Sequence, residues 1–151
     1  MTPLQWKETL SLDLPAMDEP SQQLAALLEQ ACAASDADLP AIWRQLIAHT
    51  EAQFEREDRW MLQTHFSSTQ VHSVQHKVVL QVMREGLTDK DSADDVVTGN
   101  LPLIRTMTHE LGVWFAQHNQ SMDAALALHL RKTGYDPALG VLSMPVEPVE
   151  A

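Results

Sequence analysis

His72 and His76 lie four residues apart in a segment with helical patterning. Side chains at this spacing share one face of a helix, about one turn or 6 Å apart, so both imidazoles can reach the same metal ion. A third histidine, His118, and two carboxylates, Glu57 and Asp123, lie in other predicted helices. Imidazole and carboxylate groups together suit iron, zinc or manganese. Metal binding is therefore the leading hypothesis for the chemistry of this chain.

Glu57 stands in a charged run, residues 55–59, that in isolation indicates an exposed face with local ion pairs. An apolar stripe at helical spacing passes through the same segment and includes the position of Glu57. Its other members are Ile42, Trp43, Leu46, Ile47, Thr50, Phe54 and Met61. This pattern predicts an inward Glu57, with Glu55, Arg56 and Arg59 outside. An inward carboxylate without a partner is costly, and a metal ion is one way to satisfy it.

Three motifs occur in a characteristic order: Q-F-x-x-E-x-x-x-M from Gln53, H-x-x-x-H from His72 and W-x-x-x-H-x-x-x-x-D from Trp114. With the N-terminal segment Leu12 to Asp18, they resemble the hemerythrin family of non-haem iron proteins, bacteriohemerythrins in particular. The resemblance covers about the first 130 residues. It implies a four-helix bundle in which five histidines and two bridging carboxylates hold two irons, with dioxygen bound at one of them.

Five of the seven iron-ligand positions implied by the resemblance carry the family's residues. Glu57 and Asp123 would be the bridging carboxylates, and the ligands of one iron would be His72, His76 and His118. The two histidines of the other iron would fall at Ser21 and Gln53. A glutamine is a weak, uncharged ligand, and a serine is too short to replace an imidazole without a bridging water. We therefore expect one iron rather than two, with zinc and manganese as alternative ions.

The loss of two ligands changes the expected function. Two irons give dioxygen two electrons, one from each metal, and a single ion cannot perform the same reversible step. The first hypothesis is a metal-binding protein that binds or senses dioxygen or another small ligand at one iron. The second, favoured by Ser21 and Gln53, is an interaction or sensory module without di-iron chemistry. The third is iron storage or delivery. No residue set identifies a substrate, so we assign no catalytic residue and favour a non-enzymatic role.

The spacing between His118 and Asp123 needs a distortion of the helix. Five residues turn a straight helix by about 140° beyond a full turn, so Met122 rather than Asp123 would share the stripe of His118. Both can face one ion only if the carboxylate leans or the helix end distorts. We expect Asp123 to bridge metals or to hydrogen-bond a ligand.

The other four histidines are expected to have no metal role. His65, His109 and His129 fit surface or hydrogen-bonded positions. His49 lies one turn before Gln53 on nearly the same face, but about 12 Å along the helix axis from Glu57. We therefore interpret His49 as a polar neighbour.

Helical patterning dominates the chain and predicts an all-α, up-down-up-down four-helix bundle with an N-terminal arm and a C-terminal tail. The predicted helices span about residues 20–33, 38–64, 69–86 and 101–131. Asp18 and Pro20 indicate the start of the first helix, and Asp36 or Asp38 could cap the second. Residues 87–100 form the predicted connection between the third and fourth helices, with Ala93 to Val97 either helical or irregular.

One domain, residues 1–132, is expected, followed by a tail over residues 133–151 that drapes over the bundle or is disordered. Four apolar side chains in the tail suggest docking: Leu139, Val141, Leu142 and Met144. The single Cys32 excludes an internal disulfide and favours the cytoplasm. A net charge of −11 argues against nucleic acid and anionic membranes. The sequence shows no apolar run long enough to span a membrane, and it identifies no protein partner.

Overall fold

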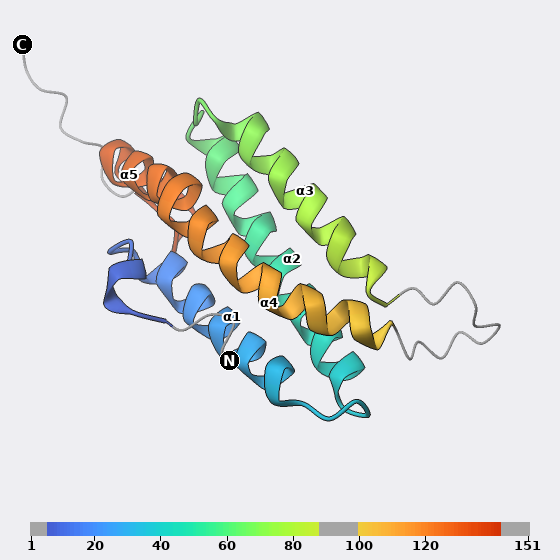
Figure 1. Cartoon of the computed structure of the whole chain (residues 1–151). Helices are drawn as coiled ribbons and strands as arrows, with labels where there is room; N and C mark the ends of the chain where they lie inside the picture. Colours follow the sequence, from blue (N-terminus) through green and yellow to red (C-terminus); the bar gives the residue numbers. More distant parts are fainter. Residues whose placement is uncertain (1–5, 88–99, 143–151) are drawn as a thin grey trace, which may run out of the picture.

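The chain folds into a bundle of four long helices, seen in a computed structural model that describes residues 6–87 and 100–142 (Figure 1). The predicted all-α, four-helix bundle is confirmed. The long helices are α1 (Pro15–Ala33), α2 (Leu39–Gln63), α3 (Thr69–Glu85) and α4 (Leu101–His118). A π-helical turn, η2 (Asn119–Asp123), joins α4 to α5 (Ala124–Thr133). Residues 88–99, which include Ala93 to Val97, lie outside the described residues.

The first helix begins at Pro15, five residues before the predicted start at position 20. Pro15 suits a helix start because the N–H it lacks would have no partner in the helix. Pro20 lies inside α1, where its ring removes one backbone hydrogen bond without ending the helix. The Asp18 carboxylate accepts hydrogen bonds from Ser11 Oγ (2.6 Å) and from the backbone N–H of Leu12 (2.8 Å). Asp18 therefore fastens the arm instead of starting the helix.

The predicted cap of the second helix is wrong. Asp38 occupies the N-cap position of α2, but its side chain makes no capping hydrogen bond. Asp36 pairs with Arg105 of α4 instead, at 2.6 Å. Pro40 near the start of α2 has no N–H to offer a cap. An interhelical ion pair and a missing donor explain why neither aspartate caps.

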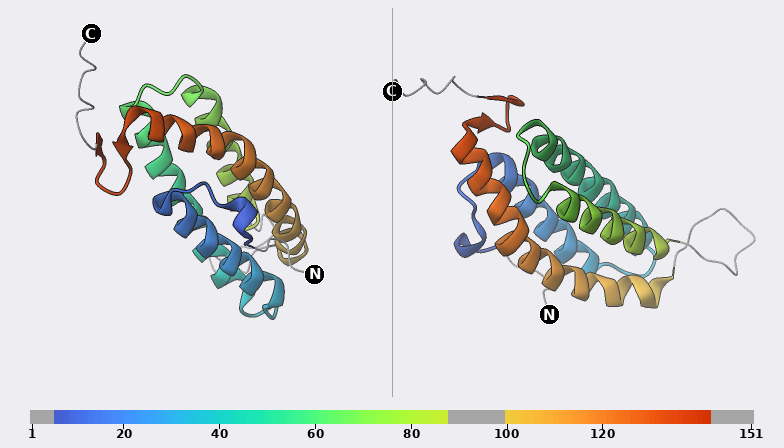
Figure 2. Two further views of the ribbon diagram at one scale, coloured as in Figure 1. Left: turned by 90° about the vertical axis from the view of Figure 1, so that its left-hand side faces the viewer. Right: turned by 90° about the horizontal axis from the view of Figure 1, so that it is seen from above.

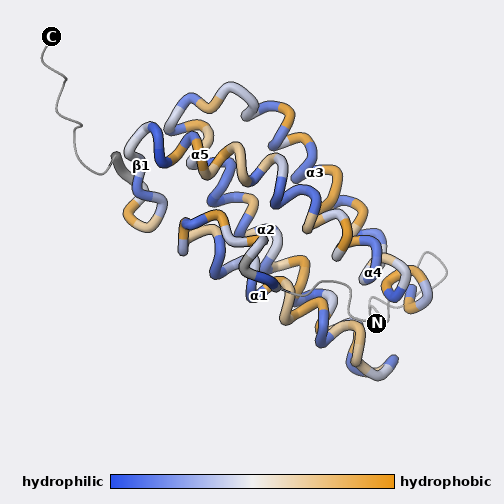
Figure 3. The backbone as a smooth tube through the Cα atoms, turned by 60° about the vertical axis from the view of Figure 1, so that its left-hand side comes forward, coloured by the Kyte–Doolittle hydropathy of each residue, from blue (hydrophilic) through white to orange (hydrophobic). Residues whose placement is uncertain are grey.

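The core consists of two apolar clusters separated by a polar layer. The first core cluster includes Leu28, Trp43, Leu46, Met83 and Ile104. The second core cluster lies toward the other end of the bundle and includes Met17, Trp60, Met61, Leu126, Leu130 and Tyr135. On α2, Phe54 belongs to the first cluster and Trp60 to the second, with buried Glu57 between them. Hydrophobic and hydrophilic residues alternate along the helices (Figure 3), as expected for amphipathic packing.

The N-terminal arm crosses the bundle against η2 and α5 (Figure 2). It carries a short 3-10 turn, η1 (Glu8–Leu10). Asn119 Nδ2 donates a hydrogen bond to the carbonyl of Leu10 at 2.8 Å, and Arg131 donates one to the carbonyl of Leu12 at 2.6 Å. These bonds hold the arm on the polar layer.

After α5, the chain forms two short antiparallel strands, β1 (Tyr135–Asp136) and β2 (Val141–Leu142). Tyr135 packs into the second core cluster and is 6% exposed. Leu139 is 71% exposed, so its predicted docking is wrong: the turn between the strands directs it to solvent. Residues 143–151, which include Met144, lie outside the described residues. The division into a domain, residues 1–132, and a tail, residues 133–151, therefore stays a prediction. None of the described helices is long and apolar enough to cross a membrane.

Candidate metal centre

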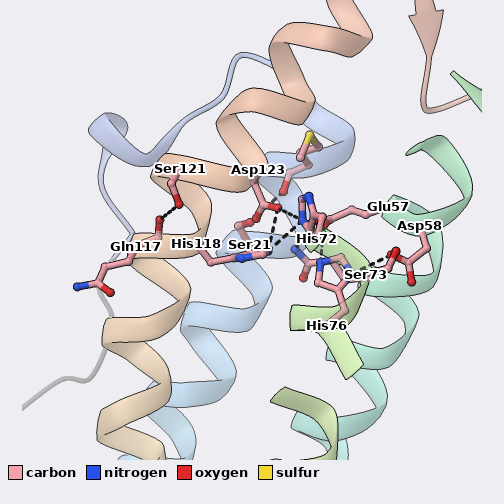
Figure 4. Close-up of polar contacts among 12 residues, drawn as sticks. Ser21, Glu57, Asp58, His72, Ser73, His76, Gln117, His118, Ser121 and Asp123 are labelled. Atoms are coloured by element: carbon pink, nitrogen blue, oxygen red, sulfur yellow. Dashed lines mark hydrogen bonds and ion pairs between the residues drawn. The ribbon is translucent and has the colours of Figure 1, made fainter. Parts of the chain in front are cut away.

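The five residues singled out as metal ligands come together in the polar layer (Figure 4). Glu57 comes from α2, His72 and His76 from α3, His118 from the end of α4 and Asp123 from the end of η2. Each offers one nitrogen or oxygen atom, and these atoms all lie within 4.8 Å of one another. All five residues are buried, none more than 4% exposed.

Three distances between these atoms match those between neighbouring ligands of one transition-metal ion. His72 Nε2 lies 3.1 Å from His118 Nε2 and 3.1 Å from Asp123 Oδ1. His76 Nε2 lies 3.3 Å from Glu57 Oε1. Ligand atoms about 2.1 Å from an ion are about 3.0 Å apart at right angles and about 3.4 Å apart in a tetrahedron. His76 Nε2 and Glu57 Oε1 have no hydrogen-bond partner among the described residues, and a metal ion would satisfy both.

The helix between His118 and Asp123 is distorted in the way that their spacing requires. Residues 119–123 form the π-helix η2, whose hydrogen bonds span five residues instead of four. This wider turn brings Asp123 Oδ1 within 3.2 Å of His118 Nε2. Met122, which a regular helix would place beside His118, is only partly buried.

The comparison with known proteins agrees with this geometry. The chain is 35% identical over 136 residues to a bacteriohemerythrin of Ralstonia nicotianae, covering 90% of this chain and 95% of that protein. The chain belongs to the hemerythrin family. No family model matches it, and no solved structure matches it significantly. The resemblance drawn from the sequence is thus confirmed, and the buried cluster identifies this hemerythrin as a metal-binding protein.

The charges in the site favour the protonated forms of His72 and His76 when no metal is bound. Burial alone would lower the pKa of His72, but the hydrogen bond with Asp123 and the negative charges of Asp123 and Glu57 raise it to about 9. Burial also opposes the charged form of His76, whose pKa is nevertheless raised by Asp58 and Glu57. The pKa of Asp123 is lowered, because hydrogen bonds with His118 and His72 outweigh its burial. A metal ion entering this hemerythrin must therefore displace protons.

Asp58 is a functional residue that the sequence analysis missed. Its Oδ1 lies 3.0 Å from His76 Nδ1 and accepts a 2.9 Å hydrogen bond from Ser73 Oγ. A metal-bound histidine commonly donates its second ring N–H to a carboxylate, which fixes the ring. The sequence feature that could have identified Asp58 is its acidic side chain directly after Glu57. The charged run around it, however, indicated an exposed face.

Two aromatic residues of the family motifs hold the histidine rings. Phe54 stacks on His76, with ring centroids 3.8 Å apart and planes 5° from parallel. Trp114 stacks on His118, with centroids 4.4 Å apart and planes 15° from parallel. These contacts restrict both imidazoles to orientations that direct Nε2 into the site.

Ser21 and Gln53, at the two positions where the family has the second metal's histidines, both make hydrogen bonds within the protein. Gln53 Nε2 donates a 3.4 Å hydrogen bond to Glu57 Oε2, so an N–H group faces the oxygen that would bridge to a second metal. Ser21 Oγ donates to the carbonyl of Met17 at 3.0 Å, within its own helix. The geometry therefore brings together the five predicted ligands but leaves Ser21 and Gln53 in other roles.

The other histidines lie where a non-metal role would place them. His49 Nε2 lies 2.8 Å from the carbonyl oxygen of Pro20 and links α2 to α1. His129 Nε2 lies 3.0 Å from the carbonyl oxygen of Thr64. His65 and His109 are exposed. None of the four belongs to the cluster that could hold a metal ion.

Proposed function

We propose that this hemerythrin binds one iron ion through five ligands: Glu57, His72, His76, His118 and Asp123. The observation that carries the proposal is the convergence of five buried ligand atoms within 4.8 Å. Iron is the metal of the family, and three imidazoles with two carboxylates suit it. The same donors accept zinc or manganese. Gln53 and Ser21 favour one ion over two, because both make hydrogen bonds within the protein.

We further propose that the site binds or senses dioxygen or another small diatomic ligand. Iron, when bound, supplies a redox-active centre at which such a ligand can be held. The protein holds the ring orientations through Asp58, Phe54 and Trp114 and excludes bulk water through burial. Reversible carriage of dioxygen at a two-electron level is disfavoured, because that step needs two metals. A non-enzymatic role and a cytoplasmic, bacterial setting remain predictions.

A second candidate function is an interaction or sensory module that has lost di-iron chemistry. The specific observation in its favour is the Gln53–Glu57 hydrogen bond, which occupies the bridging carboxylate without a second metal. This module would keep the bundle without needing metal for its activity.

Elemental analysis of protein purified anaerobically without chelator tests these functions. We expect about one iron per chain. The His76→Ala variant should lose the metal and melt at a lower temperature, because bound metal stabilises the native state by mass action. His109→Ala, at an exposed position, is the control and should keep both. If His76→Ala retains metal and melting temperature, the ligand assignment is wrong. A content of two irons per chain would support a di-iron site. A content of zero would favour the interaction module.

A further inference from the structure

A small cavity lies at the position of the family's second metal. Its volume is about 20 Å³, and its polar wall is formed by four residues: Ser21, Gln53, Asn119 and Asp123. A cavity of this size holds one water molecule or another molecule of about two heavy atoms. Trp6 and Leu10 of the N-terminal arm line it as well. The cavity is thus next to the proposed metal site and is bordered by the arm.

Gln53, one of the residues that line this cavity, carries a buried hydrogen-bond acceptor. The residue is 5% exposed. Its Nε2 faces Glu57 Oε2, as the carboxylate demands, because an ionised carboxylate can only accept hydrogen bonds. Its Oε1 is buried and has no partner among the described residues. A buried carbonyl oxygen without a donor is unfavourable, so a ligand that donates a hydrogen bond would be stabilised here.

The rest of the polar wall is also poor in donors. The Ser21 hydroxyl proton goes to the carbonyl of Met17, and Asn119 Nδ2 donates to the carbonyl of Leu10. Asp123 adds a carboxylate, which repels anions. Dioxygen and nitric oxide have no proton to donate and would leave Gln53 Oε1 unpaired. The wall therefore selects a neutral ligand with O–H or N–H groups.

We propose that this cavity binds one small neutral hydrogen-bond donor, hydrogen peroxide, in place of a water molecule beside the metal site. This inference rests on the proposed metal site, and it concerns the cavity beside that site rather than the small ligand held by the metal itself. Gln53 is a binding residue in this assignment: its Nε2 holds Glu57, and its Oε1 accepts from the ligand. The loss of the second metal's histidines has thus converted a metal position into a hydrogen-bonding pocket.

The test uses the zinc-loaded protein, because zinc has no redox role and peroxide is not consumed at it. Hydrogen peroxide is titrated while the side-chain amide resonances of Gln53 are followed by NMR. These resonances are assigned by their absence from Gln53→Leu. We expect a saturable shift that reverses on dialysis, which separates binding from oxidation. Ser21→Val, which fills the cavity, should weaken peroxide binding at least tenfold. Gln22→Val, which places valine at the exposed neighbouring position of α1, should bind like the wild type.

Zinc content is measured for each sample, so that two kinds of failure can be told apart. A wild-type protein that takes up no zinc overturns the proposed function and the inference together. One zinc per chain without a saturable shift, or with the same shift in Ser21→Val, overturns the inference alone. Two zinc ions per chain would show that the cavity binds a metal and would also overturn it. Ser21→Thr, which adds one methyl group and keeps the hydroxyl, replaces Ser21→Val if that variant folds poorly.

Discussion

Individual side chains in this site are held from more than one direction. His76 is the clearest case: its Nε2 faces Glu57, its Nδ1 faces Asp58 and its ring stacks on Phe54. A ligand held in this way loses little further freedom when a metal binds, so orientation contributes to affinity. The functional unit at this scale is therefore a ligand together with the residues that orient it.

Asp58→Asn should weaken metal binding by about 10- to 100-fold, because His76 loses the carboxylate that orients its ring. The stoichiometry at saturating metal should stay at that of the wild type, since no ligand is removed. Competition with a chromophoric chelator measures the affinity. Glu55→Gln makes the same change of charge at an exposed position of α2 and serves as control. Equal affinities for the two variants would show that Asp58 does not orient His76.

The stability of the metal-free protein should depend on pH through His72. Its pKa is about 9 in the folded protein, against about 6.5 in an unfolded chain. The stabilisation is therefore fully present below pH 6.5 and is lost as the pH rises through 9. We expect the free energy of unfolding to fall by about 3 kcal/mol over this window, measured by denaturant titration after chelation. Metal-loaded protein, in which the proton is displaced, should lack this decrease.

Among the secondary-structure elements, η2 connects the metal site to the arm. Its π-helical turn brings Asp123 beside His118. The same turn places Asn119, which donates a buried hydrogen bond to the carbonyl of Leu10. A local departure from α-helical geometry thus supports both the His118–Asp123 contact and the Asn119–Leu10 hydrogen bond. Such π-helical turns often occur at functional sites.

Asn119→Ala should loosen the arm without removing the metal. The variant leaves the carbonyl of Leu10 without its donor, and we expect a loss of about 1–2 kcal/mol in unfolding free energy. Limited proteolysis should cut the arm faster than in the wild type, whereas metal content stays the same. Gln120→Ala changes the exposed neighbour and is the control. Unchanged proteolysis in Asn119→Ala would mean that other contacts hold the arm.

Across the whole molecule, the polar layer is stable because two apolar clusters enclose it. The first and second core clusters exclude water from both ends of the site. Four helical segments pass through this layer: α1 at Ser21, α2 at Glu57, α3 at His76 and the α4–η2 junction at His118. All candidate ligands and the two substituted positions therefore lie in one layer of the bundle, and we expect the residues in this layer to decide how many metal ions it binds.

Ser21→His combined with Gln53→His should raise the metal content from about one ion per chain to about two. The two imidazoles would supply the missing ligands, and Glu57 Oε2 would be released from its hydrogen bond with Gln53. Elemental analysis and the visible absorption of an oxo-bridged or peroxide-bound iron pair measure the gain. Each single variant is a control and should stay near one ion. A double variant that also binds only one would show that the cavity has closed beyond these two positions.

The sequence by itself determined the helical bundle and the five candidate ligands. Apolar residues at helical spacing predict the buried faces, and histidines four apart share one of them, whereas the complete ligand set came from the resemblance to the hemerythrin family. The same reasoning identified Ser21 and Gln53 as departures from the family pattern, and it showed that His118 and Asp123 required a distorted helix. It placed the start of α1 too late, because a proline near position 20 indicates a start that Pro15 also satisfies.

Only the tertiary structure decided what lies around the ligands. The bond between Asp58 and His76 joins residues 18 positions apart, and the bond between Asn119 and Leu10 joins residues 109 apart. No periodicity within one helix encodes such contacts, because they depend on how separate helices and the arm pack. The direction of the Gln53 amide was decided in the same way, because its Nε2 donates a hydrogen bond to Glu57 Oε2. Spacing along the chain and the family resemblance thus selected the ligands, and packing between elements set their partners and the space beside them.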